Sequence, residues 1–170
     1  MENIKKNREF LIEDIRSLHK QSDFKDLDVT QLVAVSKKQE DFKIDLAIEY
    51  GHKIFGENRV QEAEKRWQNR IEIYKDLELR LIGPLQSNKV KQALTLFDVI
   101  ETVDREKLAK EINKNYHNEV KTKSFYIQIN TGNEIQKSGI DALQADEFIK
   151  YCIEDLNLPI VGLMLSLIHI

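Results

Sequence analysis

The chain has 170 residues and a formal net charge of −3 at pH 7, with 32% charged and 41% hydrophobic residues. This length is enough for one domain with a sizeable core, and the slightly acidic balance gives no electrostatic reason to expect nucleic acid. The sequence contains neither a membrane-spanning apolar run nor a signal-peptide core. We therefore expect a protein of the cytoplasm that partners neither nucleic acid nor a membrane.

The hydrophobic pattern alternates along the chain between a helical period and short apolar runs typical of strands. Such alternation implies right-handed parallel crossovers and predicts an α/β fold. In chain order we expect a helix at 3–21, a strand at 32–36, a helix at 41–50, a strand at 53–56, a helix at 58–74, a strand at 78–83, a helix from Ser87, a strand at 98–102, a helix at 104–117, a strand at 124–130, a helix at 142–155 and a strand at 159–165.

The first predicted strand lies in LVAVSKKQ, residues 32–39, and runs directly into two lysines. Its successive apolar residues are typical of a parallel strand that is covered on both faces. A lysine at the end of such a strand is either the first solvated residue of a loop or a nucleophile held at the rim of the sheet. The residues alone leave both interpretations of Lys37 open.

Polar residues also follow the later strands, at the points where helices begin. Asn58, Ser87 and Asp141 stand at positions typical of helix N-caps. The same rim, at the carboxyl ends of parallel strands, is where folds of this class bind ligands. Each of these residues is therefore a candidate for capping and for binding, whereas Lys89 and Lys137 are explained more simply as solvated charges.

The cysteine and histidine content predicts no disulfide and no metal centre. The single cysteine, Cys152, excludes an internal disulfide. It lies in a helical apolar pattern, so we expect it to pack in the core. The histidines are scattered without the spacing of metal ligands.

Seven short segments carry a resemblance to a known family. Together they cover roughly residues 5–164, in order and without a large gap. The segments are VAVSK (33–37), FGENRVQE (55–62), IGPLQSNK (82–89), TVD (102–104), QIN (128–130), KSGI (137–140) and GLM (162–164). On these segments the chain resembles the pyridoxal phosphate homeostasis protein family, which is similar to the N-terminal domain of alanine racemase.

The resemblance implies a (β/α)8 TIM-type barrel that binds pyridoxal 5′-phosphate (PLP) at its C-terminal rim. The family's cofactor lysine matches Lys37, which would form a covalent imine with PLP. Lys38 departs from the family, which usually has a small hydroxylated residue there, and Arg80 stands where histidine is frequent. The resemblance places Asn58 and the backbone near Leu85 along the cofactor ring, with three accessory candidates, Ser87, Asn130 and Lys137.

The resemblance also implies that the barrel is incomplete, with about six of eight strands in residues 1–164. The last residues, LSLIHI (165–170), match one translation of the mosaic end of transposase-based sequencing libraries, so we expect a non-native tail there. An incomplete barrel is expected to expose strand edges and apolar faces. PLP binding by residues 1–170 is expected to be weaker than by a complete barrel.

Three functions are compatible with these observations. The family implies a non-catalytic PLP carrier or buffer that maintains intracellular PLP homeostasis and hands the cofactor to apo-enzymes. The alternative is a PLP-dependent enzyme similar to amino-acid racemases. A third interpretation is a binding module that acts through the charged helix at 58–74, although charges of alternating sign usually mark a solvated face.

Overall fold

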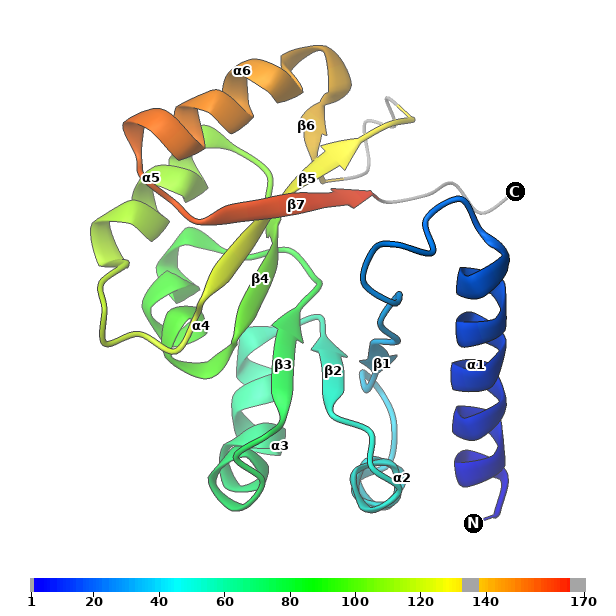
Figure 1. Cartoon of the computed structure of the whole chain (residues 1–170). Helices are drawn as coiled ribbons and strands as arrows, with labels where there is room; N and C mark the ends of the chain where they lie inside the picture. The colour runs from blue at the N-terminus through cyan, green and yellow to red at the C-terminus, as the bar shows by residue number, and fades with distance from the viewer. Residues whose placement is uncertain (1, 133–137, 166–170) are drawn as a thin grey trace. The chain divides into compact units, whose positions relative to one another are not determined.

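The structure is a computed structural model that describes residues 2–132 and 138–165. The chain divides into two compact units, Met1–Phe55 and Gly56–Ile170. Figure 1 shows the course of the chain through both.

The first unit contains two helices and the first strand. Its elements are α1 (Glu2–Gln21), β1 (Ala34–Val35), α2 (Asp41–Glu49) and the first half of β2 (Ile54–Glu57). Residues on one side of α1 at helical spacing, Ile12 and Ile15 among them, are half-buried. The strand predicted at 32–36 is only two residues long, because Leu32 and Val33 precede it without regular pairing.

The turn after α2 is tied down by hydrogen bonds within the first unit. Gly51 ends the helix with a φ of +81°, a conformation that glycine adopts without strain. Its carbonyl accepts a hydrogen bond of 2.8 Å from Nη2 of Arg8 on α1. The buried His52 ring donates through Nε2 to the Ile54 carbonyl at 2.8 Å. Burial lowers the pKa of His52, which favours this neutral, donating ring.

The second unit is a parallel α/β sheet with helical crossovers. All its described strand pairs are parallel: β3 with β4, β4 with β5, and β5 with both β6 and β7. After β2 its elements are α3 (Val60–Ile73), β3 (Glu78–Leu81), the 3₁₀ helix η1 (Ser87–Lys89), α4 (Val90–Leu96), β4 (Val99–Val103), α5 (Glu106–Asn115), β5 (Ser124–Asn130), β6 (Ile140–Asp141), the 3₁₀ helix η2 (Ala142–Gln144), α6 (Ala145–Lys150), the π-helix η3 (Tyr151–Asp155) and β7 (Ile160–Leu165). The predicted α/β alternation is confirmed, with one additional short strand, β6.

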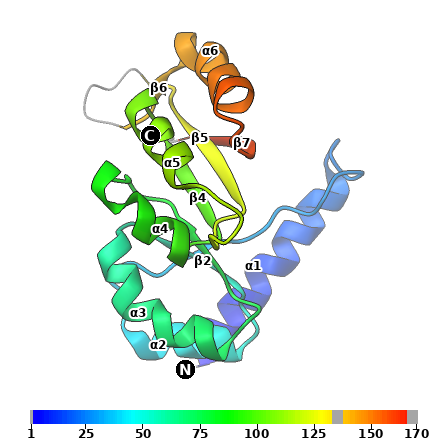
Figure 2. The ribbon, with the colours of Figure 1, turned by 90° about the vertical axis from the view of Figure 1, so that its left-hand side faces the viewer.

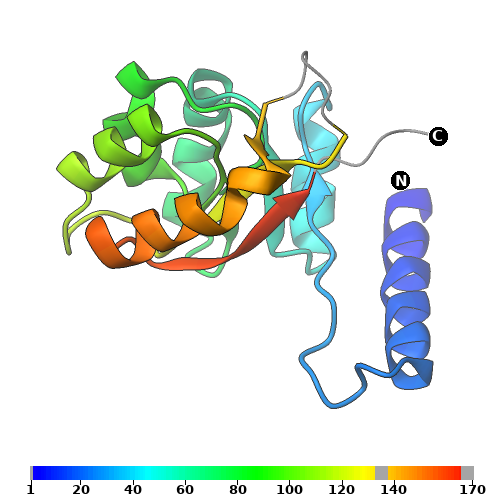
Figure 3. The same cartoon turned by 90° about the horizontal axis from the view of Figure 1, so that it is seen from above.

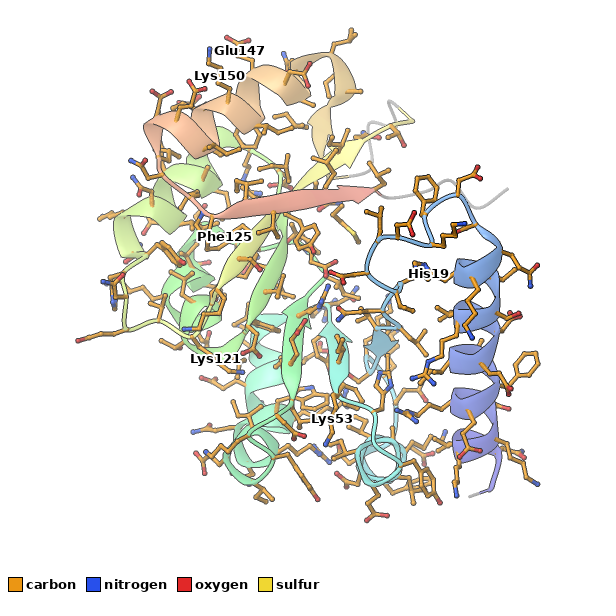
Figure 4. All side chains as sticks on the ribbon, viewed as in Figure 1. His19, Lys53, Lys121, Phe125, Glu147 and Lys150 are labelled. Atoms are coloured by element: carbon orange, nitrogen blue, oxygen red, sulfur yellow. The ribbon has the colours of Figure 1, made fainter. Side chains whose placement is uncertain are left out.

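One face of this sheet carries the core of the second unit. Residues alternate along β5, so that Phe125, Ile127 and Ile129 are buried while their neighbours are half-buried. Figure 2 shows α4 and α5 beside β4 and β5, and Phe125 meets Tyr116, just after α5, edge to face at 5.2 Å between ring centroids. Figure 4 shows that Glu147 and Lys150 project from α6 away from the sheet.

The last described strand, β7, leaves one apolar face open. Figure 3 shows β7 running beside α6, and its pairing partner is β5. Val161, Leu163 and Leu165 alternate along β7 and are 59%, 49% and 46% exposed. The expectation of exposed apolar faces is thus confirmed for β7.

The described residues contain no helix that is both long enough and apolar enough to cross a bilayer. Within the same residues, no three histidine, cysteine or acidic side chains gather in a way that would hold a metal ion.

The buried Cys152 generates the first prediction. Its side chain is inaccessible, as expected from its pattern, and burial raises the pKa of the thiol to about 11. At pH 8 such a thiol is ionised to only about one part in a thousand, and the thiolate is the reactive form. We expect no reaction of native protein with a chromogenic disulfide reagent at pH 8, and complete reaction in denaturant. Rapid labelling of native protein would contradict the burial.

Candidate functional site

Lys37 lies in a tight turn of the first unit, directly after β1. The amide of Gln39 donates to the Ser36 carbonyl at 3.1 Å, so Lys37 and Lys38 are the two central residues of this turn. Both side chains are exposed, whereas Ser36 is buried. The φ of Lys38 is +59°, in the left-handed region that non-glycine residues rarely adopt. Turn geometry, and not strand alternation, therefore sets the directions of the two lysines.

A cleft of about 690 Å³ lies within the second unit, at the carboxyl ends of β2, β3, β4 and β5. This is the edge at which the sequence predicts ligand binding. Predicted site residues Asn58 and Leu85 both line it, whereas Ser87 and Asn130 do not. The lining residues are Asn58, Arg59, Val60, Gln61, Pro84, Leu85, Gln86, Lys89, Asp104, Arg105 and Ser138.

The remaining predicted site residues are Ser87, Asn130 and Lys137. Ser87 is the first residue of η1, and Asn130 ends β5 in register with Asp141. Lys137 falls outside the described residues.

The capping role predicted for Asn58 is wrong. Helix α3 begins at Val60, so the residue at its N-cap is Arg59, and no side chain caps it. Asn58 stands one residue too early to reach the free amides of the first turn. Its Oδ1 atom is instead buried and has no hydrogen-bond partner among the described residues.

Of the other two predicted caps, Asp141 is confirmed and Ser87 is wrong. Ser87 is not a cap, because η1 has Gln86 at its N-cap and no side-chain hydrogen bond there. Asp141 is a cap as predicted: its carboxylate accepts from the Leu143 amide at 2.8 Å. The difference arises because Asp141 directly precedes its helix, whereas Ser87 is already inside one.

Arg105 joins the loops that follow β3 and β4. Its guanidinium donates to the Leu85 carbonyl at 2.9 Å and is paired with the carboxylate of Asp104. Burial raises the pKa of Asp104, although the neighbouring Arg105 charge opposes this shift. The motif TVD drew attention to Asp104, but Arg105 was missed because only the tertiary structure shows which carbonyl it reaches.

Arg80 belongs to an ion network on β3 and β4. Its Nη1 lies 3.1 Å from the Glu101 carboxylate and its Nε lies 2.5 Å from Glu78. The side chains of Arg80 and Glu101 are largely shielded from solvent, and that of Glu78 is 35% exposed. The arginine therefore has two carboxylate partners of its own in this chain.

The family model for the alanine racemase N-terminal domain matches residues 15–169. The chain is 36% identical over 166 residues to the pyridoxal phosphate homeostasis protein of Vibrio alginolyticus, a match that covers 96% of this chain and 71% of that protein. It spans less of other curated relatives, for example 49% of the Aquifex aeolicus protein of the same name.

Solved structures with the same fold include PipY and alanine racemase. PipY of Synechococcus elongatus with PLP bound is 29% identical with a TM-score of 0.70, and the match covers 91% of this chain and 69% of PipY. Alanine racemase of Bacillus anthracis has a TM-score of 0.60 over 90% of this chain and 38% of the racemase, but its 12% identity shows the fold alone.

The fold and these matches define the class as the alanine racemase N-terminal domain, and the described strands form an incomplete TIM-type barrel. Within that class, the chain belongs to the pyridoxal phosphate homeostasis protein family.

The second prediction concerns Oδ1 of Asn58, which is buried and has no hydrogen-bond partner among the described residues. A buried acceptor without a donor costs about 1–3 kcal/mol. Asn58→Ala removes this atom and no cap, so we expect the free energy of unfolding to stay constant or to rise by up to about 1 kcal/mol. Asp141→Ala is the matched control, because it removes a real cap and should cost about 1 kcal/mol. Urea denaturation measures both, and a loss in Asn58→Ala as large as in the control would contradict the assignment.

Proposed function

We propose that this chain is part of a protein that binds PLP reversibly and maintains the intracellular pool of the cofactor, without catalytic turnover. The observation that carries the proposal is the cleft at the carboxyl ends of β2 to β5, which is lined by Asn58, a residue whose buried Oδ1 has no partner among the described residues. Membership of the family supports it, as does the PLP bound to PipY, a relative at 29% identity.

The donor and acceptor groups of the cleft suit a ligand such as PLP. The buried Oδ1 of Asn58 needs a hydrogen-bond donor, which a ring hydroxyl or a protonated ring nitrogen supplies. Lys89 supplies positive charge toward an anionic ligand and Ser138 supplies a hydroxyl, whereas the charge of Arg105 is paired with Asp104. The cofactor itself would supply an aldehyde that captures amines reversibly.

Under this proposal Lys37 is the amine that forms the imine with PLP. The support for Lys37 is its match to the family's cofactor lysine and its place directly after β1. Lys37 is not among the residues that line the cleft. Asn58 and the backbone at Leu85 contact the ring. Ser87, Asn130 and Lys137 remain accessory candidates. Apo-enzymes that take up PLP are the proposed partners, and the cytoplasm is the proposed location.

The racemase alternative has less support. A two-base racemase needs a second acid–base group on the opposite face of the cofactor ring. The likeness to alanine racemases is at the level of fold.

The binding-module alternative is also weaker, because polar groups around α3 are engaged within the chain. Arg66 pairs with Glu57 at 3.2 Å, and Glu64 accepts from Gln92 at 2.6 Å. Arg59 pairs with Glu62 at 2.9 Å on an exposed surface, as expected for a solvated face.

The third prediction tests the imine. Lys37→Ala should abolish the imine absorbance band and the borohydride-trapped adduct, because the amine is lost. Lys38→Ala is the matched control from the same turn and should retain both. Peptide mass mapping of the trapped adduct identifies the lysine. An adduct on Lys38 or Lys89 in the unmodified chain would show that the assignment to Lys37 is wrong.

The fourth prediction separates carrier from enzyme. With PLP and a panel of L-amino acids, we expect no D-amino acid above the level produced by free PLP, as measured by chiral chromatography. Racemisation that exceeds free PLP and disappears in Lys37→Ala would establish the alternative.

A further inference from the structure

The buried carboxylate of Glu57, which directly precedes Asn58, has no role in the proposed binding of PLP. Its side chain is completely inaccessible, at the end of β2. Its Oε1 accepts from Trp67 Nε1 at 3.0 Å and from Arg66 Nη1 at 3.2 Å. Trp67 is itself fully buried on α3. A carboxylate is costly to bury, and the two donors from α3 offset that cost only while its position is maintained.

The main chain at this point is held from the neighbouring strand as well. The carbonyl of Glu57 accepts from the Ile82 amide at 2.9 Å. A Cβ atom at Gly83 would lie 2.2 Å from the Asn58 carbonyl oxygen, so only glycine permits this approach. The Gly83 carbonyl in turn accepts from Thr102 Oγ1 at 2.9 Å.

These contacts hold the peptide that joins Glu57 to Asn58 from both sides. Asn58 directly follows β2, which ends at Glu57, so the contacts of Glu57 fix the backbone from which the Asn58 side chain emerges. Asn58 lines the cleft together with Val60 and Gln61 at the start of α3.

We infer that Glu57, held by Trp67 and Arg66, is a positioning residue that fixes Asn58 in the wall of the cleft before any ligand binds. The device holds the backbone of Asn58 in place, so that a ligand in the cleft meets this residue without first ordering it. This inference rests on the proposed function for its ligand but not for its geometry.

The test separates positioning from general stability. Glu57→Gln retains the shape of the side chain and removes the charge that its two donors share, and it should weaken PLP binding about tenfold. Trp67→Phe removes one donor from a buried ring and should weaken it about fivefold. Glu64→Gln, which alters another hydrogen-bonded carboxylate of α3, is the control and should remain within about twofold of the unmodified chain.

If Glu57 acts through Asn58, the two effects are not additive. Glu57→Gln combined with Asn58→Ala should then bind PLP no more than about twofold weaker than Asn58→Ala alone. A merely structural role would give independent losses that multiply. Multiplying losses, or unchanged affinity in Glu57→Gln, would overturn the inference.

A second measurement does not depend on PLP. The side-chain amide signals of Asn58 in a heteronuclear NMR spectrum should shift in Glu57→Gln and Trp67→Phe, and should stay in place in Glu64→Gln. Unchanged Asn58 signals would overturn the inference even if PLP binds. Shifted signals in a chain that fails to bind PLP would support it and would contradict the proposed function instead.

Discussion

The second unit depends on the constraint that parallel strands leave their carboxyl ends at one edge of the sheet. Strands β3, β4 and β5 are paired in parallel, and each connection returns the chain through a helix. Loops that are distant in sequence are thereby brought together at that edge. The cleft contains residues from four such loops, and no single loop could build it.

At that edge, two neighbouring residues, Glu57 and Asn58, differ in the hydrogen bonds that their buried oxygens receive. Glu57 is buried, and its Oε1 atom receives hydrogen bonds from Arg66 and Trp67. The Oδ1 atom of Asn58 is buried and receives none from the described residues. A polar atom in this condition reduces stability unless a ligand satisfies it. The same atom is therefore a cost to the ligand-free fold and a source of affinity in the complex.

The order and approximate position of the elements were predictable because apolar periodicity is a local property. The strand at 124–130 was predicted residue for residue, since its buried and half-buried positions alternate strictly. The helix predicted at 142–155 has the right bounds but changes from 3₁₀ to α to π geometry. Apolar spacing alone does not distinguish these, because segments of 3, 6 and 5 residues are too short to show their different numbers of residues per turn. The two-residue β6 was missed because it is too short to show a period.

The sequence by itself determined the α/β class, the motifs that mark the family, the burial of Cys152 and the cap formed by Asp141. Each of these depends on residues close together in the chain or on overall composition. Only the tertiary structure decided that Asn58 is not a cap, that Gly83 lies against its backbone and that Arg105 reaches the Leu85 carbonyl. These facts depend on which donor reaches which buried oxygen across different strands and helices. Local patterns do not encode that information, because such contacts arise only when distant segments pack together.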